Sequence, residues 1–236
     1  ININFANAEI IERALDQIGL NPLESSTIVN SIEDWRDPDY FCRIDGAETD
    51  DYLRAPRPYS AKDGPIDQLS ELLLVQGMSP DLLWGPVRAS FYGPGLVSRW
   101  TGNAPASPSA VGALGLADLF NTAGELRINV NTAPVEVLQL VPGIDEVIAQ
   151  SIVDLRDGMD GVDGTEDDLP PVNPRELINA VGVTPQLAQV LTRFCDVRSQ
   201  TFEARVRVHV GNYQRTYVAW LSLQAPTVPV LNAYWE

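Results

Sequence analysis

The chain is poor in basic residues. Its 236 residues include 16 Lys and Arg against 32 Asp and Glu, which gives a formal net charge of −16. Proteins bind nucleic-acid phosphates through cationic side chains that displace counterions, so this balance argues against a nucleic-acid partner. It suits hard divalent cations, which bind oxygen ligands. An acidic surface also keeps a protein soluble, and the charge by itself leaves that alternative open.

The residue types that carry most enzymatic chemistry are also scarce. His209 is the single histidine, and it lies on a predicted strand among basic neighbours, without a positioned partner for acid–base work. Cys42 and Cys195 have no histidine near them in sequence, and the chain has no Gly-rich phosphate loop. We therefore expect no enzymatic activity. The two cysteines form no CxxC pair, so they either join in one disulfide in an oxidising compartment or remain as two free thiols.

Long apolar runs are missing as well. No segment is long enough to span a bilayer, and the start of the chain has neither the basic nor the apolar region of a signal peptide. The sequence begins within a pattern typical of a folded protein. We therefore expect the natural protein to extend further upstream.

What the chain does contain is an internal repeat. Ile1–Asn4 reads Ile-Asn-Ile-Asn and Ile128–Asn131 reads Ile-Asn-Val-Asn, and each opens a helical stretch that ends in Arg-Asp, at residues 36–37 and 156–157. An acidic loop follows each Arg-Asp, and then a second helical pair interrupted by a glycine. Duplication at this scale predicts stacked helical hairpins.

The period changes after the second repeat. Apolar and polar residues alternate from Phe202 to Val210, Gly211-Asn212 is a hairpin turn signal, and Thr216 to Leu223 returns. The pattern predicts an α+β fold with a small antiparallel sheet and a large helical domain of duplicated hairpins, of the helix-hairpin-helix or SAM-like kind. The expected segments are a first helical repeat with its acidic loop, a Gly/Pro/Ala-rich linker, a second such repeat, a β-hairpin and a surface tail, at 1–91, 92–125, 126–196, 197–225 and 226–236.

The second acidic loop is the sharpest chemical signal. Carboxylates this dense repel one another, and a bound Ca²⁺ would remove that penalty because it accepts six to eight oxygens. The carboxylates stand three apart where an EF-hand needs two, so the loop is not an EF-hand. The candidate ligands here are Asp157, Asp160, Asp163, Glu166, Asp167 and Asp168.

The first repeat has an acidic loop at the corresponding place. Its candidate ligands are Asp37, Asp39, Asp45, Glu48, Asp50 and Asp51. We expect one or two Ca²⁺ ions in total; the alternative is a pair of solvated acidic loops. Asp34 and Asp154, at the ends of the return helices, either join the ligands or pair with Arg36 and Arg156.

The segment Asn129–Pro134, followed by Leu140–Ile144, is similar to a helix-hairpin-helix motif. In DNA-binding versions the hairpin reads Gly-hydrophobic-Gly, and its amides meet a phosphate at a helix N-terminus. Here Asp145 replaces the second glycine and Glu146 follows. Two carboxylates at that position repel a phosphate, so we expect the motif without DNA binding.

Taken together, these motifs resemble the type II secretion system minor pseudopilin K family, also called general secretion pathway protein K. The residues that carry the resemblance are Ile1–Asn4, Asp34–Asp39, Gly46–Tyr52, Pro65–Met78, Ile128–Pro134 and the hairpin Arg198–Leu223. The Gly/Pro/Ala-rich stretch Gly93–Gly124 has no counterpart that we can place in the family.

The resemblance implies a pseudopilin fold, in which a large helical domain interrupts a small sheet, with calcium sites in the helical domain. It implies a minor pseudopilin at the tip of the pseudopilus, assembled with the I and J minor pseudopilins for protein export. Family members are anchored by an N-terminal hydrophobic helix that this chain lacks. We therefore expect the soluble periplasmic part of a protein anchored in the inner membrane. The alternatives are a helix-hairpin-helix nucleic-acid binder and a type IV pilus minor pilin.

Overall fold

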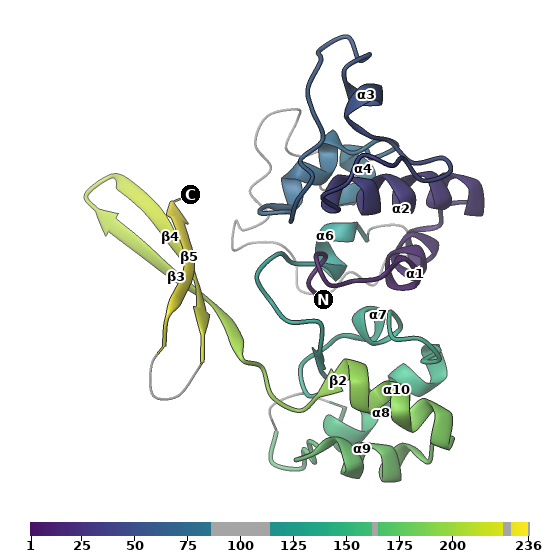
Figure 1. Cartoon of the computed structure of the whole chain (residues 1–236). Helices are drawn as coiled ribbons and strands as arrows, with labels where there is room; N and C mark the ends of the chain where they lie inside the picture. The colour runs from purple at the N-terminus through teal and green to yellow at the C-terminus, as the bar shows by residue number, and fades with distance from the viewer. Residues whose placement is uncertain (86–113, 162–164, 224–227, 236) are drawn as a thin grey trace. The chain divides into compact units, whose positions relative to one another are not determined.

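A computed structural model describes residues 1–85, 114–161, 165–223 and 228–235, and the chain divides into two compact units (Figure 1). One unit comprises residues 2–122, and the other comprises residues 123–236 together with Ile1. Most of the predicted linker 92–125 lies outside the described residues.

The first unit is helical, as predicted. Its elements are α1 (Ala8–Ile18), α2 (Pro22–Arg36), α3 (Thr49–Tyr52), the 3-10 helix η1 (Leu69–Leu74), α4 (Pro80–Trp84) and α6 (Leu116–Leu119). The side chain of Asn7 caps α1 by accepting from the backbone of Ile10, and Gly19 ends this helix with a φ of 92°. Asn21 caps α2, and Pro22 occupies its first turn. These local signals produce the first hairpin.

The core of the first unit lies between α1 and α2 and extends to α6. Ile11, Leu15 and Ile32 are fully buried, and so is Leu116 of α6. The helix α6 packs against α1 and α4. The prediction that the linker extends to residue 125 is therefore wrong for 114–122, because the apolar Leu-Ala-x-Leu-Phe run there is buried in the first unit.

The second unit begins with a similar helical part. Its elements are β1 (Ile128–Asn129), α7 (Val135–Leu138), α8 (Glu146–Arg156), α9 (Pro174–Val181), α10 (Pro185–Phe194) and β2 (Cys195–Asp196). Strands β1 and β2 pair in parallel, with Ile128 opposite Cys195. Side chains of Asp145, Asn173 and Thr184 cap α8, α9 and α10.

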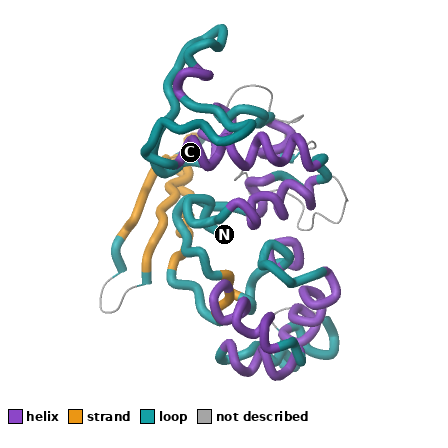
Figure 2. Tube along the Cα trace, turned by 45° about the vertical axis from the view of Figure 1, so that its right-hand side comes forward, coloured by secondary structure: helices purple, strands orange, loops and turns teal. Residues whose placement is uncertain are grey.

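The rest of the second unit is a three-stranded antiparallel sheet in the order β3 (Thr201–Val210), β4 (Tyr213–Ser222) and β5 (Val230–Trp235) (Figure 2). The predicted hairpin is confirmed, with Gly211 at a φ of 60° in its turn. The prediction that 226–236 is a surface tail is wrong. Both prolines of that segment precede β5, so all six strand residues retain the backbone N–H that pairing with β4 uses.

The two Ile-Asn-x-Asn openings adopt the same turn. In the first, the amides of Phe5 and Ala6 donate to the carbonyl of Asn2, and in the second those of Thr132 and Ala133 donate to Asn129. In the first opening, Asn2 also forms an isolated parallel bridge with Asn121.

Candidate metal centres

The two repeats share a long-range contact that fixes the start of each acidic loop. Arg36 lies at the end of α2, and its Nη1 donates to the carbonyl of Ile3. The same nitrogen donates to the carbonyl of Ala6 at 3.1 Å. Arg156 Nη1, at the end of α8, donates to the carbonyls of Val130 at 2.9 Å and Ala133 at 2.6 Å. We call each set an arginine clasp. Because these carbonyls belong to the repeated turn, each clasp ties the helix end to the opening of its own repeat.

Asp34 and Asp154, which lie near the clasp arginines, do not pair with them. Arg36 pairs with Glu33 at 2.6 Å, whereas Asp34 binds Arg43. Arg156 pairs with Asp157 at 2.9 Å, and Asp154 accepts from Gln150. Of the two alternatives for Asp34 and Asp154, pairing with Arg36 and Arg156 is therefore wrong, because both guanidinium groups point to the repeated turn. Metal ligation by these two aspartates stays a prediction.

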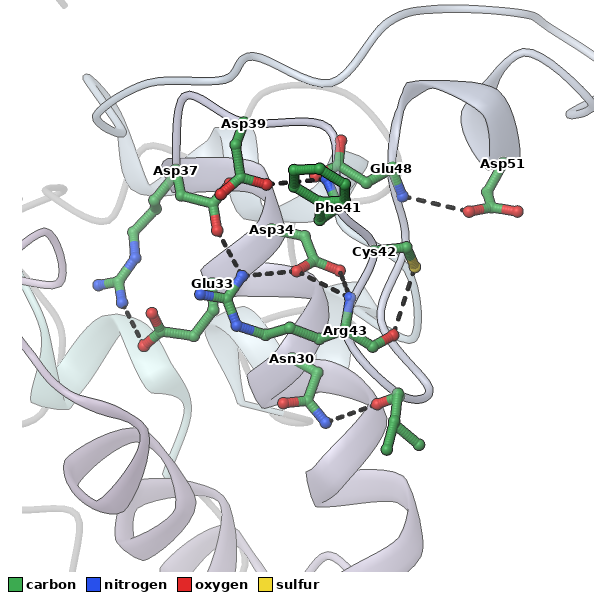
Figure 3. A network of polar contacts seen from close by, with 12 residues as sticks. Asn30, Glu33, Asp34, Asp37, Asp39, Phe41, Cys42, Arg43, Glu48 and Asp51 are labelled. Carbon is green, nitrogen blue, oxygen red and sulfur yellow. Dashed lines mark hydrogen bonds and ion pairs between the residues drawn. The ribbon is translucent and has the colours of Figure 1, made fainter.

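The first acidic loop brings three predicted ligands together. Carboxylate oxygens of Asp37, Asp39 and Glu48 lie within 4.8 Å of one another. Asp37 is the C-cap residue of α2, Asp39 follows two residues later, and Glu48 is the N-cap residue of α3. The clasp thus lies next to one side of the group and α3 begins at the other. Figure 3 shows the side chains of Asp37, Asp39 and Glu48 in this loop.

Two oxygens of this group lack the partners that buried oxygens normally have. Glu48 is 5% exposed, and its Oε1 has no hydrogen-bond partner among the described residues. Oδ1 of Asp37 is also buried and has no hydrogen-bond partner among them. Burial raises the pKa of Glu48, and the charge of Asp34 adds to this effect. Buried polar atoms are rarely left unsatisfied, so both oxygens fit the ligands of a hard cation.

Arg43 joins this group to a fully buried carboxylate. Asp34 is 0% exposed, and it accepts from the backbone amide of Arg43 at 3.2 Å and from Arg43 Nη1 at 2.7 Å. The same Nη1 also contacts Asp37 Oδ2. The hydrogen bonds that Arg43 donates to Asp37 and Asp34 raise its pKa. A Cβ on Gly46 would lie 2.0 Å from Asp34 Oδ2, so only glycine allows this packing.

The second acidic loop also gathers three predicted ligands. Oxygens of Asp160, Asp167 and Asp168 lie within 4.8 Å of one another. The hydroxyl of Thr165 lies 3.3, 2.8 and 3.2 Å from an oxygen of each. The amide of Met159 donates to Asp167 at 2.8 Å, and these contacts, Thr165 first, lower the pKa of Asp167. Three carboxylates that converge on one hydroxyl lie close enough together to share one hard cation.

The other candidate ligands stand outside these two groups. Asp51 bonds to the amide of Glu48 at 3.2 Å in a capping box and pairs with Arg54, and Asp157 pairs with Arg156. Asp45, Asp50 and Glu166 belong to neither group, and Asp163 lies outside the described residues. Sequence reasoning missed Arg43, Gly46 and Thr165. The Glu-x-x-Asp spacing of a capping box was the available signal that Asp51 serves the helix.

Both thiols are free in the structure. Cys42 is exposed in the first acidic loop, and Cys195 is buried in β2, where burial raises its pKa to about 12. Because Cys42 lies in the first unit and Cys195 in the second, the choice between a disulfide and two free thiols stays a prediction.

The helix-hairpin-helix turn has the geometry that its sequence predicts. Gly143 has a φ of 83°, and Asp145 Oδ1 accepts from the amide of Ile148 at 2.9 Å. Asp145 thus uses one of the amides that would otherwise face a phosphate at the start of α8. Among the described residues, no helix is long and apolar enough to cross a membrane.

The chain is similar to known proteins in several ways. Residues 2–84 match the family model described as type II secretion system (T2SS), protein K, and residues 124–167 match a helix-hairpin-helix motif. Over 75 residues the chain is 32% identical to type II secretion system protein K of Klebsiella pneumoniae and 31% identical to that of Pectobacterium carotovorum subsp. carotovorum. These matches cover 32% of this chain and 23% of each relative, so the chain spans about a quarter of their length.

The fold is also similar to a solved structure. A chain of the GspK-GspI-GspJ complex from the enterotoxigenic Escherichia coli type 2 secretion system matches all of this chain and 75% of its own length, with a TM-score of 0.65 and 17% identity. That likeness confirms the predicted α+β fold, with its small antiparallel sheet and its helix-hairpin-helix part. The resemblance drawn from the sequence is confirmed as well: residues 2–84 match the family model of type II secretion system protein K, and 75 residues are similar to curated proteins of that name.

Proposed function

We propose that this chain is the periplasmic part of a minor pseudopilin, which acts at the tip of the type II secretion pseudopilus in protein export. The observation that carries the proposal is the match of residues 2–84 to protein K, together with a fold likeness over the whole chain. The GspK-GspI-GspJ complex supports the I and J minor pseudopilins as its partners. The full-length protein would be anchored in the inner membrane by an N-terminal helix.

We propose a structural role without catalysis. The single histidine, His209, is exposed on β3, opposite Gln214. Each acidic loop gathers three carboxylates whose oxygens lie within 4.8 Å of one another, and oxygen ligands are what hard cations bind.

Co-purification tests the role. The chain, extended by its native upstream segment, should form a stable complex when expressed with I and J pseudopilins of the same organism. A complex with type IV pilus minor pilins in place of I and J would contradict the secretion role. The match of residues 124–167 to a helix-hairpin-helix motif makes nucleic-acid binding the alternative to test. Retardation of duplex DNA in a gel-shift assay at low salt would favour that alternative.

We propose further that Asp37, Asp39 and Glu48 hold one Ca²⁺ and that Asp160, Asp167 and Asp168 hold a second. The buried, unpartnered Glu48 Oε1 is the strongest support for the first centre. When bound, the ion would neutralise the repulsion among these carboxylates and close each loop.

Thermal unfolding in calcium and in chelator tests both centres. Calcium should raise the melting temperature of the wild-type chain, and Asp39→Asn or Asp167→Asn should each remove part of that rise. Asp16→Asn, on the exposed side of α1, is the matched control and should leave the rise intact. An equal rise in all four proteins would mean that calcium binds elsewhere.

A further inference from the structure

The first acidic loop already contains a cation of its own. Arg43 Nη1 contacts two carboxylates at once: Asp34, which is buried beneath the loop, and Asp37, which belongs to the candidate calcium ligands. Figure 3 shows these three side chains together, with Asp39 and Glu48 nearby. One guanidinium nitrogen is therefore shared between a structural carboxylate and a ligand carboxylate.

We propose that Arg43 determines the calcium affinity of this centre. Its guanidinium neutralises Asp37 in the absence of metal, and a divalent cation replaces the guanidinium at Asp37 when it binds. The inference rests on the calcium centre proposed above and adds a residue that opposes the ion. Asp37 would exchange between Arg43 and the ion, while Asp34 would keep Arg43 in the loop.

The two carboxylates are held unequally, and this gives the exchange its direction. Asp34 is 0% exposed and accepts from the backbone amide of Arg43 as well as from its side chain, so it stays bound when Asp37 leaves. Asp37 Oδ2 contacts the guanidinium, whereas its buried Oδ1 has no hydrogen-bond partner. Asp37 therefore has one oxygen ready for a cation, but the positive charge of Arg43 lies beside it.

Charge sets the expected size of the effect. A guanidinium repels a divalent cation that lies roughly 5 Å away, even at the dielectric constant of water. This repulsion weakens the affinity for the cation about tenfold. Salt screens part of this repulsion because the loop is exposed to solvent. Removing the charge of Arg43 should therefore strengthen calcium binding, most clearly at low ionic strength.

The test is calorimetric titration with Ca²⁺, in a chain whose second centre is disabled by Asp167→Asn with Asp168→Asn. In that background Arg43→Gln should bind Ca²⁺ about tenfold more tightly. Arg43→Lys keeps the charge and should bind much like the parent. Arg54→Gln removes an equal charge from the pair with Asp51, outside the ligand group, and should change affinity little. Equal or weaker binding by Arg43→Gln would overturn the proposal.

A second measurement, on the parent chain, does not need Arg43→Gln, in case that variant does not fold. The side-chain Nε–Hε NMR signal of Arg43, assigned by its loss in Arg43→Lys, should move when Ca²⁺ is added and return with chelator. An unmoved signal would overturn the role of Arg43 if Ca²⁺ still raises the melting temperature through Asp39. If Ca²⁺ has no effect on the melting temperature, the calcium centre itself fails and this inference fails with it.

Discussion

Replacing Gly46 by alanine should destabilise the first unit, because the new methyl group would collide with a buried carboxylate. The Cβ would lie 2.0 Å from Asp34 Oδ2, 3.0 Å from its Cγ and 3.3 Å from the Arg43 carbonyl. Asp34 would have to move by about 1 Å or more to restore an ordinary van der Waals contact. Such a movement breaks its hydrogen bonds to the amide and guanidinium of Arg43.

The expected magnitude follows from the burial of the two partners. Breaking a fully buried ion pair costs about 3–5 kcal/mol. The side chain of Arg43 is 39% exposed, so water screens the pair and the expected cost falls below that range, to about 2–3 kcal/mol. For a unit of this size the melting temperature should fall by roughly 8–16 °C.

Gly64→Ala is the matched control. Its Cβ would meet only the carbonyl of Lys62 at 3.7 Å, so its stability should stay within about 1 kcal/mol of the parent. Urea unfolding in chelator, followed by the fluorescence of the buried Trp35, measures both variants without a contribution from metal. If Gly46→Ala proves as stable as Gly64→Ala, the tight packing between Gly46 and Asp34 does not hold.

Four further predictions concern the thiols, the clasp and the sheet. A thiol reagent should label Cys42 in the native chain and Cys195 only after unfolding; two equally reactive thiols would contradict the burial of Cys195. The pKa of Cys195 rises from 9.0 to about 12 on folding, so the contribution of the neutral thiol to stability is complete below pH 9 and is lost as the pH rises toward 12. Cys195→Ala should reduce this loss of stability in alkaline unfolding curves. Arg36→Gln removes the clasp and should lower the free energy of unfolding by about 2–3 kcal/mol. The control Arg13→Gln, at a surface pair with Glu9, should lower it by under about 1 kcal/mol. Equal losses in the two variants would refute the role of the clasp. Deleting residues 228–236 leaves a two-stranded hairpin, which is marginally stable alone, so amide exchange in β4 should accelerate; unchanged protection would mean that β5 does not pair there.

The sequence by itself determined the elements whose signals lie within a few residues. Asn7 and Gly19 bound α1, Asn21 and Pro22 start α2, and Gly211 turns the β-hairpin, because caps and turns are satisfied by their immediate neighbours. The repeated Ile-Asn-x-Asn opening likewise predicted two similar helical parts. The two acidic loops were identified as candidate metal sites from their charge density alone.

Only the tertiary structure decided which carboxylates meet and which cations they bind. Asp37, Asp39 and Glu48 converge because α2 ends and α3 begins on the same side of the loop, whereas Asp51 faces its own helix cap. Arg36 bonds to a carbonyl 33 residues away rather than to the nearby Asp34. Sequence spacing could not predict these partners, because an ion pair depends on distance and burial in the folded chain, and chain order fixes neither.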